Sequence, residues 1–235
     1  MTHTPVEDSE TQRVSRRGFL ASAGVVSSYV AAGVAGFAGG ALTVNAAQAS
    51  TPEKEAQLRA QQQSATIPFY GEYQAGIMTP LQAYGTYAAF TLKPGITVDQ
   101  ARSMMQLLTD DAARLAKGKP TLPDGEPYLA TEPARLTSTF GFGPGFFSKL
   151  GLQGAMPSGF GELPAFSIDQ LQPEFSGGDL VIHVGADNPL TVAHAARQLS
   201  RTAHTFAEPL WSQTGFNRPQ YGVPSDQTGR NLFGQ

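Results

Sequence analysis

The sequence contains no cysteine. Without thiols the chain cannot form a disulfide scaffold, a thiolate-ligated haem, an iron–sulfur cluster or a zinc–thiolate site, so any metal or cofactor needs histidine, carboxylate or backbone groups. Charge is also sparse: 16 Lys and Arg stand against 19 Asp and Glu in 235 residues, without a basic run. This balance argues against nucleic acid or an anionic membrane as the main partner. Glycine and proline, 26 and 17 residues, stay below the level of low-complexity chains, so we expect a globular fold.

The first 49 residues have the composition of an export signal. Arg16 and Arg17 precede an uncharged stretch over residues 18–49 that closes with Ala47-Gln48-Ala49. Basic, apolar and small residues in this order are typical of a cleaved signal peptide, and the arginine pair resembles the twin-arginine motif. A retained membrane anchor is the alternative, because a stretch of this length can span a bilayer, although its glycines weaken it. We predict a twin-arginine signal peptide at residues 1–49, the twin-arginine translocase as a partner, and a periplasmic or extracellular location.

Residues 50–65 are polar and rich in glutamine, with no apolar stripe wide enough to pack. We predict a flexible leader there, followed by a domain that spans residues 66–235. Within that domain, runs of β-branched and aromatic residues bounded by turn residues predict strands. The predicted strands cover residues 86–92, 135–140, 179–185 and 210–216.

Two helices are predicted between these strands. The first begins after Thr97, because Thr97 and Gln100 have the spacing of a capping box, and it ends at Gly118. The second begins at Asn188-Pro189, an N-cap residue followed by proline at the first helical position. The predicted buried stripes are Val98, Ala101, Met105, Leu108, Ala112 and Leu115 in the first helix, and Val192, Ala196, Leu199, Ala203 and Phe206 in the second.

The order strand, helix, strand, strand, helix, strand predicts an α+β fold. It is the ferredoxin-like arrangement, an antiparallel sheet with two helices on one face. Residues 118–134 and 151–178 are expected to be loops, and long loops in a compact domain often form the walls of a binding site. The glycine run at residues 141–145 suggests a phosphate cradle, but Pro144 removes one amide and no Lys-Ser/Thr ending follows. Nucleotide binding is therefore disfavoured.

The four histidines offer little for a metal site. His3 lies in the predicted signal peptide. His194 and His204 share the second helix with Arg197 and Arg201, and at about 100° per residue all four fall opposite the buried stripe. We therefore predict that they form a solvated face.

The remaining chemical groups do not form a complete active site. His183 is expected on the sheet face away from the core, where a surface or partly packed role is favoured over a ligand role. The adjacent Asp110 and Asp111 are expected to be solvent-facing charges. The sequence has no His-Glu-x-x-His pair and no Gly-x-Ser-x-Gly elbow. The residues alone therefore predict an exported ferredoxin-like domain without an assigned reaction.

Four sequence blocks carry a family resemblance. The segment FYGEYQAGIMTPLQ, residues 69–82, resembles the opening signature of the Dyp-type haem peroxidases. It is most similar to their secreted iron-uptake branch, the deferrochelatase/peroxidases, which frequently have histidine where Tyr73 stands. Residues 136–144, 177–180 and 230–235 are similar to further family blocks, so the resemblance extends along the predicted domain.

The resemblance implies a fold of two ferredoxin-like halves that form an α+β barrel, with haem b in the C-terminal half. This sequence resembles the N-terminal half. In the family, the Arg-Asn-Leu of residues 230–232 leads into a Gly-x-x-Asp-Gly motif that contains the acid–base residue for peroxide. Gly234 and Gln235 would be its first two positions, and the family's proximal histidine and distal arginine come later. The resemblance thus implies no catalytic or metal-ligating residue here, and it implies cofactor-binding roles for Asn231, Phe233, Gly234 and Gln235.

Two functions of different class follow from this reading. The first is a haem peroxidase that uses hydrogen peroxide to oxidise one-electron donors, of which this sequence lacks the catalytic half. The second is a non-catalytic binding or assembly domain of an iron-uptake system. The twin-arginine motif favours the first, because that route exports folded proteins that already hold a cofactor. The resemblance also admits a homo-oligomer, haem-iron release and iron-uptake partners.

Overall fold

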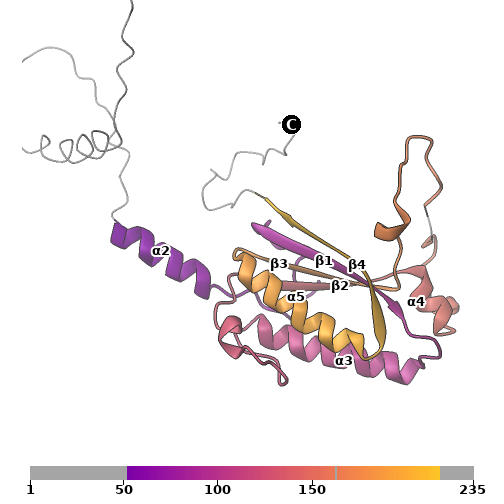
Figure 1. The fold of residues 1–235 in the computed structure, drawn as a ribbon, viewed down its shortest axis with the longest axis horizontal. Coiled ribbons are helices and arrows are strands. Elements are labelled where there is room, and N and C mark those ends of the chain that lie inside the picture. Colours follow the sequence, from indigo (N-terminus) through magenta and orange to yellow (C-terminus); the bar gives the residue numbers. More distant parts are fainter. Residues whose placement is uncertain (1–51, 162, 218–235) are drawn as a thin grey trace, which may run out of the picture. The chain divides into compact units, whose positions relative to one another are not determined.

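The computed structural model describes residues 52–161 and 163–217. Figure 1 shows their helices and strands in a single ribbon. The strands are β1 Tyr84–Leu92, β2 Thr137–Phe142, β3 Leu180–Ala186 and β4 Ala207–Phe216. The α-helices are α2 Pro52–Ser64, α3 Val98–Leu115, α4 Pro144–Lys149 and α5 Pro189–His204, and short 3-10 turns cover Pro127–Ala130, Gln153–Ala155 and Pro173–Phe175.

The four strands form one antiparallel sheet in the order β2-β3-β1-β4. In its register Ile182 of β3 pairs with Ala88 of β1 on one side and with Phe140 of β2 on the other. Strands β1 and β2 are not neighbours, and neither are β3 and β4, because a helix carries the chain across the sheet between the two strands of each pair. This confirms the predicted ferredoxin-like topology, and each predicted strand lies within two to three residues of its observed limits.

Helices α3 and α5 pack side by side on one face of the sheet (Figure 1). The core between them and the sheet is apolar, and its largest members are fully buried: Phe90, Leu92, Met104, Leu108, Leu115, Leu136, Leu180, Ile182 and Leu199. Burial of such a side chain contributes about 1.5–3 kcal/mol. Most members of the two predicted stripes are buried, but Met105, Ala196 and Phe206 are only partly buried and Val98, at the start of α3, is exposed. Met104, and not the predicted Met105, is the fully buried methionine of α3.

The predicted caps fix where both helices begin. The Thr97 hydroxyl accepts a hydrogen bond from the Gln100 amide at 3.2 Å, and the Gln100 side chain accepts one from the Thr97 amide at 2.9 Å. Asn188 caps α5 by accepting from the Leu190 amide at 2.9 Å. Such caps contribute about 1 kcal/mol each. The predictions of a capping box and of an Asn-Pro helix start are confirmed.

Two glycines after β2, Gly143 and Gly145, allow this segment to pack closely against Gly178 and Asp179. A Cβ atom on Gly143 would collide with the Gly178 carbonyl, and one on Gly145 would collide with the carboxylate of Asp179. That buried carboxylate accepts hydrogen bonds from the Leu92 amide at 2.7 Å and from Lys149 Nζ at 2.6 Å. Two of the blocks that carry the family resemblance therefore pack against each other at this point.

Five elements were not predicted. Helix α2 occupies the polar leader, where glutamine and alanine favour helix but no apolar stripe signals it. Helix α4 begins at Pro144, two residues after the end of β2. One 3-10 turn lies within the predicted loop over residues 118–134, and two lie within the predicted loop over residues 151–178. Whether the leader is flexible stays a prediction. Across the described part of the chain, no helix is both long and apolar enough to cross a membrane.

Candidate functional site

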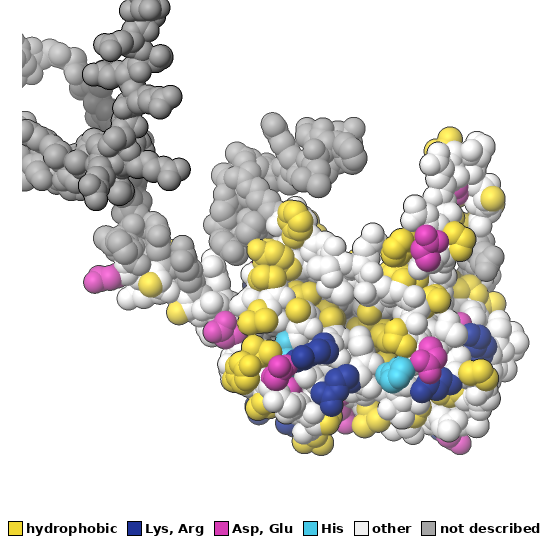
Figure 2. Space-filling model, viewed as in Figure 1, with side chains coloured by type: hydrophobic (Ala, Val, Ile, Leu, Met, Phe, Trp, Pro, Cys, Tyr) yellow, Lys and Arg dark blue, Asp and Glu magenta, His cyan; other side chains and the backbone are white. Residues whose placement is uncertain are grey.

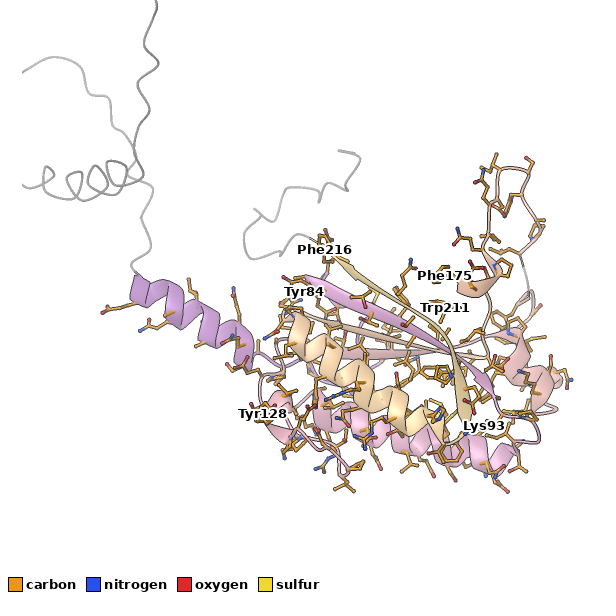
Figure 3. The ribbon with its side chains drawn as sticks, in the orientation of Figure 1. Tyr84, Lys93, Tyr128, Phe175, Trp211 and Phe216 are labelled. Atoms are coloured by element: carbon orange, nitrogen blue, oxygen red, sulfur yellow. The ribbon has the colours of Figure 1, made fainter. Side chains whose placement is uncertain are left out.

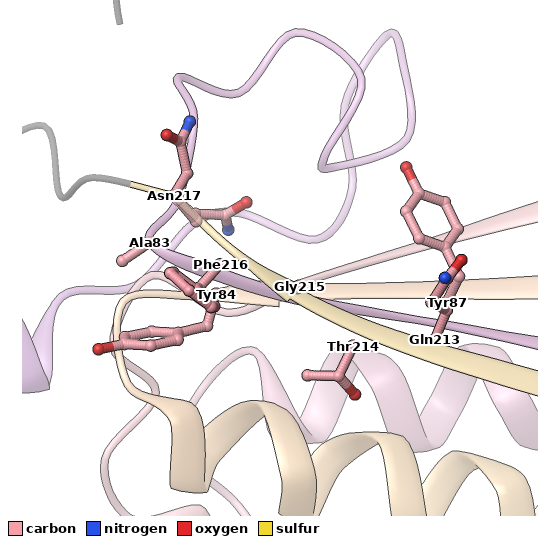
Figure 4. A pocket seen from close by; sticks show the side chains of 10 residues that line it. Ala83, Tyr84, Tyr87, Gln213, Thr214, Gly215, Phe216 and Asn217 are labelled. Carbon is pink, nitrogen blue, oxygen red and sulfur yellow. The ribbon is translucent and has the colours of Figure 1, made fainter. Parts of the chain in front are cut away.

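The sheet face opposite the helices is open and carries a row of glycines. Gly85 of β1 lies between Gly185 of β3 and Gly215 of β4 in the register of the sheet. Gly215 has nothing within 4 Å of the position a Cβ would take, so the backbone of β4 is accessible there. A cavity of about 460 Å³ is lined by Gly85 and Gly215, at the start of β1 and the end of β4 (Figure 4).

An aromatic pair lies beside the glycine row. The Tyr87 ring stacks on the His183 ring across β1 and β3, with ring centroids 4.3 Å apart and an angle of 22° between the planes. Gln213 is the partner of Tyr87 on β4, and Figure 4 shows the two side chains next to each other on the side away from the helices. Burial lowers the pKa of His183 below its usual value of 6.5, so the imidazole is neutral at pH 7.

The same face continues toward the loop that precedes β3. Trp211 on β4 donates through its indole nitrogen to the Gly177 carbonyl at 3.0 Å. The 3-10 turn that ends at Phe175 contacts β4, and Figure 3 shows Phe175 and Trp211 near each other. Within residues 151–178, the large exposed apolar side chains are Phe160, Leu163, Phe166, Ile168, Leu171 and Phe175 (Figure 2).

The segment over residues 69–82 runs along the edge of the sheet. Gln74 pairs with the backbone of Phe140 in both directions, accepting from its amide and donating to its carbonyl at 2.9 Å each. Gln82 donates to the carbonyls of Arg135 and Gly185 at 2.6 and 3.1 Å. Gln74 thereby pairs backbone groups on the outer edge of β2, the edge strand of the sheet. Sequence reasoning missed this role, although two glutamines in a largely apolar block were the signal.

The prediction that His194 lies on a solvated face is wrong. Its side chain is only 1% exposed, and its Nε2 lies 3.0 Å from Asp124 Oδ2. Asp124 comes from the loop over residues 118–134, which folds over this face of α5 and covers it. Arg197, Arg201 and His204 are exposed, as predicted.

The aspartate pair on α3 is also only partly as predicted. Asp110 is exposed, but Asp111 is half-buried and accepts a hydrogen bond from Thr202 of α5 at 2.6 Å. Burial raises the pKa of Asp111 above its usual value. The hydrogen bond between Asp111 and Thr202 links α3 to α5. The two residues are distant in sequence, so no local sequence pattern predicts this contact.

Comparison with known proteins decides the family. Residues 74–217 match the family model described as "Dyp-type peroxidase, N-terminal". This range begins at Gln74 and ends one residue after β4, so it contains the whole sheet. The chain belongs to the Dyp-type peroxidase family.

Individual relatives agree with this membership. The dye-decolorizing peroxidase of Thermobifida fusca is 33% identical over 241 residues, which cover 97% of this chain and 55% of the relative. The crystal structure of a DyP-type peroxidase from Cellulomonas bogoriensis superposes with a TM-score of 0.71 at 39% identity, covering 74% of this chain and 48% of that one. A DyP-type peroxidase from Streptomyces coelicolor gives a TM-score of 0.70 at 38% identity, with the same two coverages of 74% and 48%. The chain therefore spans about half the length of the relatives it matches.

The histidines of the described Dyp-type domain do not fit an axial role toward haem. His183 has one ring face against Tyr87, and its Nε2 lies over the backbone of Gly85 in β1, 3.2 Å from the position a Cβ would take there. His194 is buried against Asp124. His204 lies more than half exposed at the end of α5, beside Glu208 and outside any apolar enclosure. Among the residues described, no three histidine or carboxylate groups are placed to hold a metal ion.

The cofactor-binding residues predicted from the sequence lie elsewhere. Asn231, Phe233, Gly234 and Gln235 fall outside the described residues, as do Arg16 and Arg17 of the predicted signal. Tyr73, at the position where the iron-uptake branch frequently has histidine, is more than half exposed. Among the described residues, the open sheet face is therefore the candidate site.

Proposed function

We propose that this protein acts as the N-terminal half of a haem-dependent Dyp-type peroxidase, an oxidoreductase that uses hydrogen peroxide to oxidise one-electron donors. The observation that supports this most is the family match over residues 74–217, which covers the sheet and both helices. Haem b, when bound, supplies the redox chemistry toward peroxide and donor. Residues outside the described range hold it in this proposal, because the three histidines within that range do not fit the role.

The proposed contribution of this half is a docking face for the haem-bearing half. At Gly215, where no side chain covers the backbone of β4, another surface can approach the sheet closely. The Tyr87–His183 stack and Trp211 supply apolar contact area next to the glycine row. The neutral state of His183 suits such a buried interface, because an imidazolium there would have to lose its hydration.

A peroxidase assay on two proteins tests this proposal. One is the 235-residue chain, and the other is the product of its coding region extended beyond Gln235 to the length of the relatives. We expect the longer protein to bind haem and to oxidise a one-electron dye donor with hydrogen peroxide, whereas the 235-residue chain does neither. Absence of peroxide turnover in the haem-loaded longer protein would contradict the proposed activity.

A second candidate function is haem-iron release in iron uptake, with partners from an iron-uptake system. It is favoured by a Deferrochelatase of Yersinia pestis, 29% identical over 219 residues that cover 89% of this chain and 48% of the relative. A colorimetric iron chelator distinguishes the two functions on the longer protein. Iron appearing in the chelator while the porphyrin stays intact supports release, and dye oxidation without iron loss supports the peroxidase. The non-catalytic alternative predicts neither signal.

We also propose export by the twin-arginine translocase to the periplasm or the cell exterior. The motif around Arg16 and Arg17 supports this, because the translocase recognises a pair of arginines in the signal peptide. Replacing both arginines with lysine should trap the precursor in the cytoplasm. Normal export of the double variant would contradict the proposal. A homo-oligomer stays a prediction.

A further inference from the structure

A second cavity lies on the other side of β2, away from the open sheet face. Its volume is about 410 Å³, which is within the usual range for small-molecule sites. Three elements enclose it: the edge segment over residues 69–75, the Met105 and Thr109 side of α3, and the helix-facing side of β2. We call this cavity the β2 groove.

The walls of the β2 groove are held by hydrogen bonds between distant segments. Gln74 is fixed by its two hydrogen bonds to the Phe140 backbone. The Thr139 hydroxyl donates to the Ala75 carbonyl at 2.7 Å, one residue further along the edge segment. The edge segment is thereby joined to β2 at both points, so the groove is formed before a ligand arrives. Such preorganisation reduces the entropy lost on binding.

One polar group in the groove lacks a partner. Ser138 is 98% buried in β2 and lines the groove, yet its hydroxyl oxygen has no hydrogen-bond partner among the described residues. Ser138 lies opposite Val184 of β3 in the register of the sheet. A buried hydroxyl without a partner is unfavourable, and such a group in a native fold calls for an explanation. A ligand hydroxyl would satisfy it.

The other lining side chains are mostly apolar and aromatic. Phe69, Phe140 and Phe142 line the groove together with the thioether of Met105. Met105 is half-buried and has three rotatable bonds, so it is the neighbour that can turn aside to open a path to the Ser138 hydroxyl. Glu72 is the charged residue of the lining, and its carboxylate disfavours an anionic ligand.

We propose that the β2 groove binds a small neutral phenol. The ring packs among the phenylalanines and Met105, and the phenolic hydroxyl exchanges a hydrogen bond with Ser138 Oγ. This site requires neither haem nor the open sheet face, so it stands independently of the proposed function.

Titration of the 235-residue chain with phenol and with toluene tests the proposal, followed by NMR of the methionine methyl groups. We expect phenol to shift the Met105 methyl signal saturably and to show nuclear Overhauser contacts to it, while the signal of Met156 stays in place. Ser138→Ala should weaken phenol binding by about three- to tenfold, the value of one neutral hydrogen bond, and leave toluene binding unchanged. Ser148→Ala is the matched control, because the Ser148 hydroxyl donates to the Pro144 carbonyl on α4, outside the groove.

Three results would overturn the proposal. The first is a phenol titration that leaves the Met105 signal unshifted in the wild-type chain. The second is an equal loss of phenol and toluene affinity in Ser138→Ala, which would mean that the variant changes the groove rather than one hydrogen bond. The third is tighter binding of benzoate than of phenol, which would contradict the role given to Glu72. The contacts to the Met105 methyl group need no variant, so the proposal stays testable if Ser138→Ala folds poorly.

Discussion

His194 Nε2 lies 3.0 Å from Asp124 Oδ2, and each side chain is only 1% exposed. The pair joins helix α5 to the loop over residues 118–134. Gln198, one turn further along α5, donates to the other oxygen of Asp124 at 2.9 Å. The Glu126 amide donates to that same oxygen, also at 2.9 Å. The loop is therefore fixed to the helix by a buried polar cluster and covers a face of α5 that would otherwise meet water.

Removing one partner of this buried pair should destabilise the fold strongly. His194→Ala leaves the Asp124 carboxylate buried with fewer partners, and such a loss costs about 3–5 kcal/mol. Urea unfolding followed by circular dichroism measures the free energy of unfolding. His204→Ala is the matched control, because His204 lies exposed on the same helix and should change stability by less than about 0.5 kcal/mol. Similar effects from both variants would show that the cluster adds nothing.

Two adjacent leucines of α3 should respond differently to truncation. Leu108 is fully buried in the core, whereas Leu107 is 50% exposed. We expect Leu108→Ala to lower the free energy of unfolding by about 2–5 kcal/mol, because it removes buried methyl groups and leaves a cavity. Leu107→Ala should stay near the wild-type value. A larger loss of stability in Leu107→Ala than in Leu108→Ala would contradict the observed packing of α3, in which Leu108 faces the core.

His183 should make stability depend on pH. Its folded-state pKa is lowered by burial, so the unfolded chain binds a proton more readily than the folded chain. The contribution of the neutral imidazole is therefore present above the ordinary pKa of 6.5 and is lost as the pH falls below it. His183→Phe keeps an aromatic ring against Tyr87 but cannot titrate. We expect the variant to lose less stability than the wild type between pH 7.5 and 5.5, and parallel losses would contradict this account.

Much of the fold was predictable because its signals are local. The capping box at Thr97 and the Asn188-Pro189 start are short-range patterns, and they predicted correctly where α3 and α5 begin. The alternation of apolar residues in β3 likewise identified which side chains face the helices. The order of the elements then left the ferredoxin-like arrangement as the expected topology.

The errors arose where distant segments meet. The helical periodicity placed His194 opposite the apolar stripe correctly, but it contained no information that the loop around Asp124 returns to cover that face. The roles of Gln74 and Gln82 toward β2 and β3 depend on contacts across more than 60 residues of sequence. Tertiary contacts of this kind have no period in the sequence, and only the folded chain reveals them.

In the proposed function, residues outside the described range hold the haem, and the histidines within that range do not ligate it. A haem titration of the 235-residue chain, followed by Soret absorbance, tests this. We expect only the broad band of weakly associated haem, unchanged by alanine replacement of His183, His194 or His204. A sharp ligated Soret band that disappears in the His183→Ala or His194→Ala variant would contradict the account.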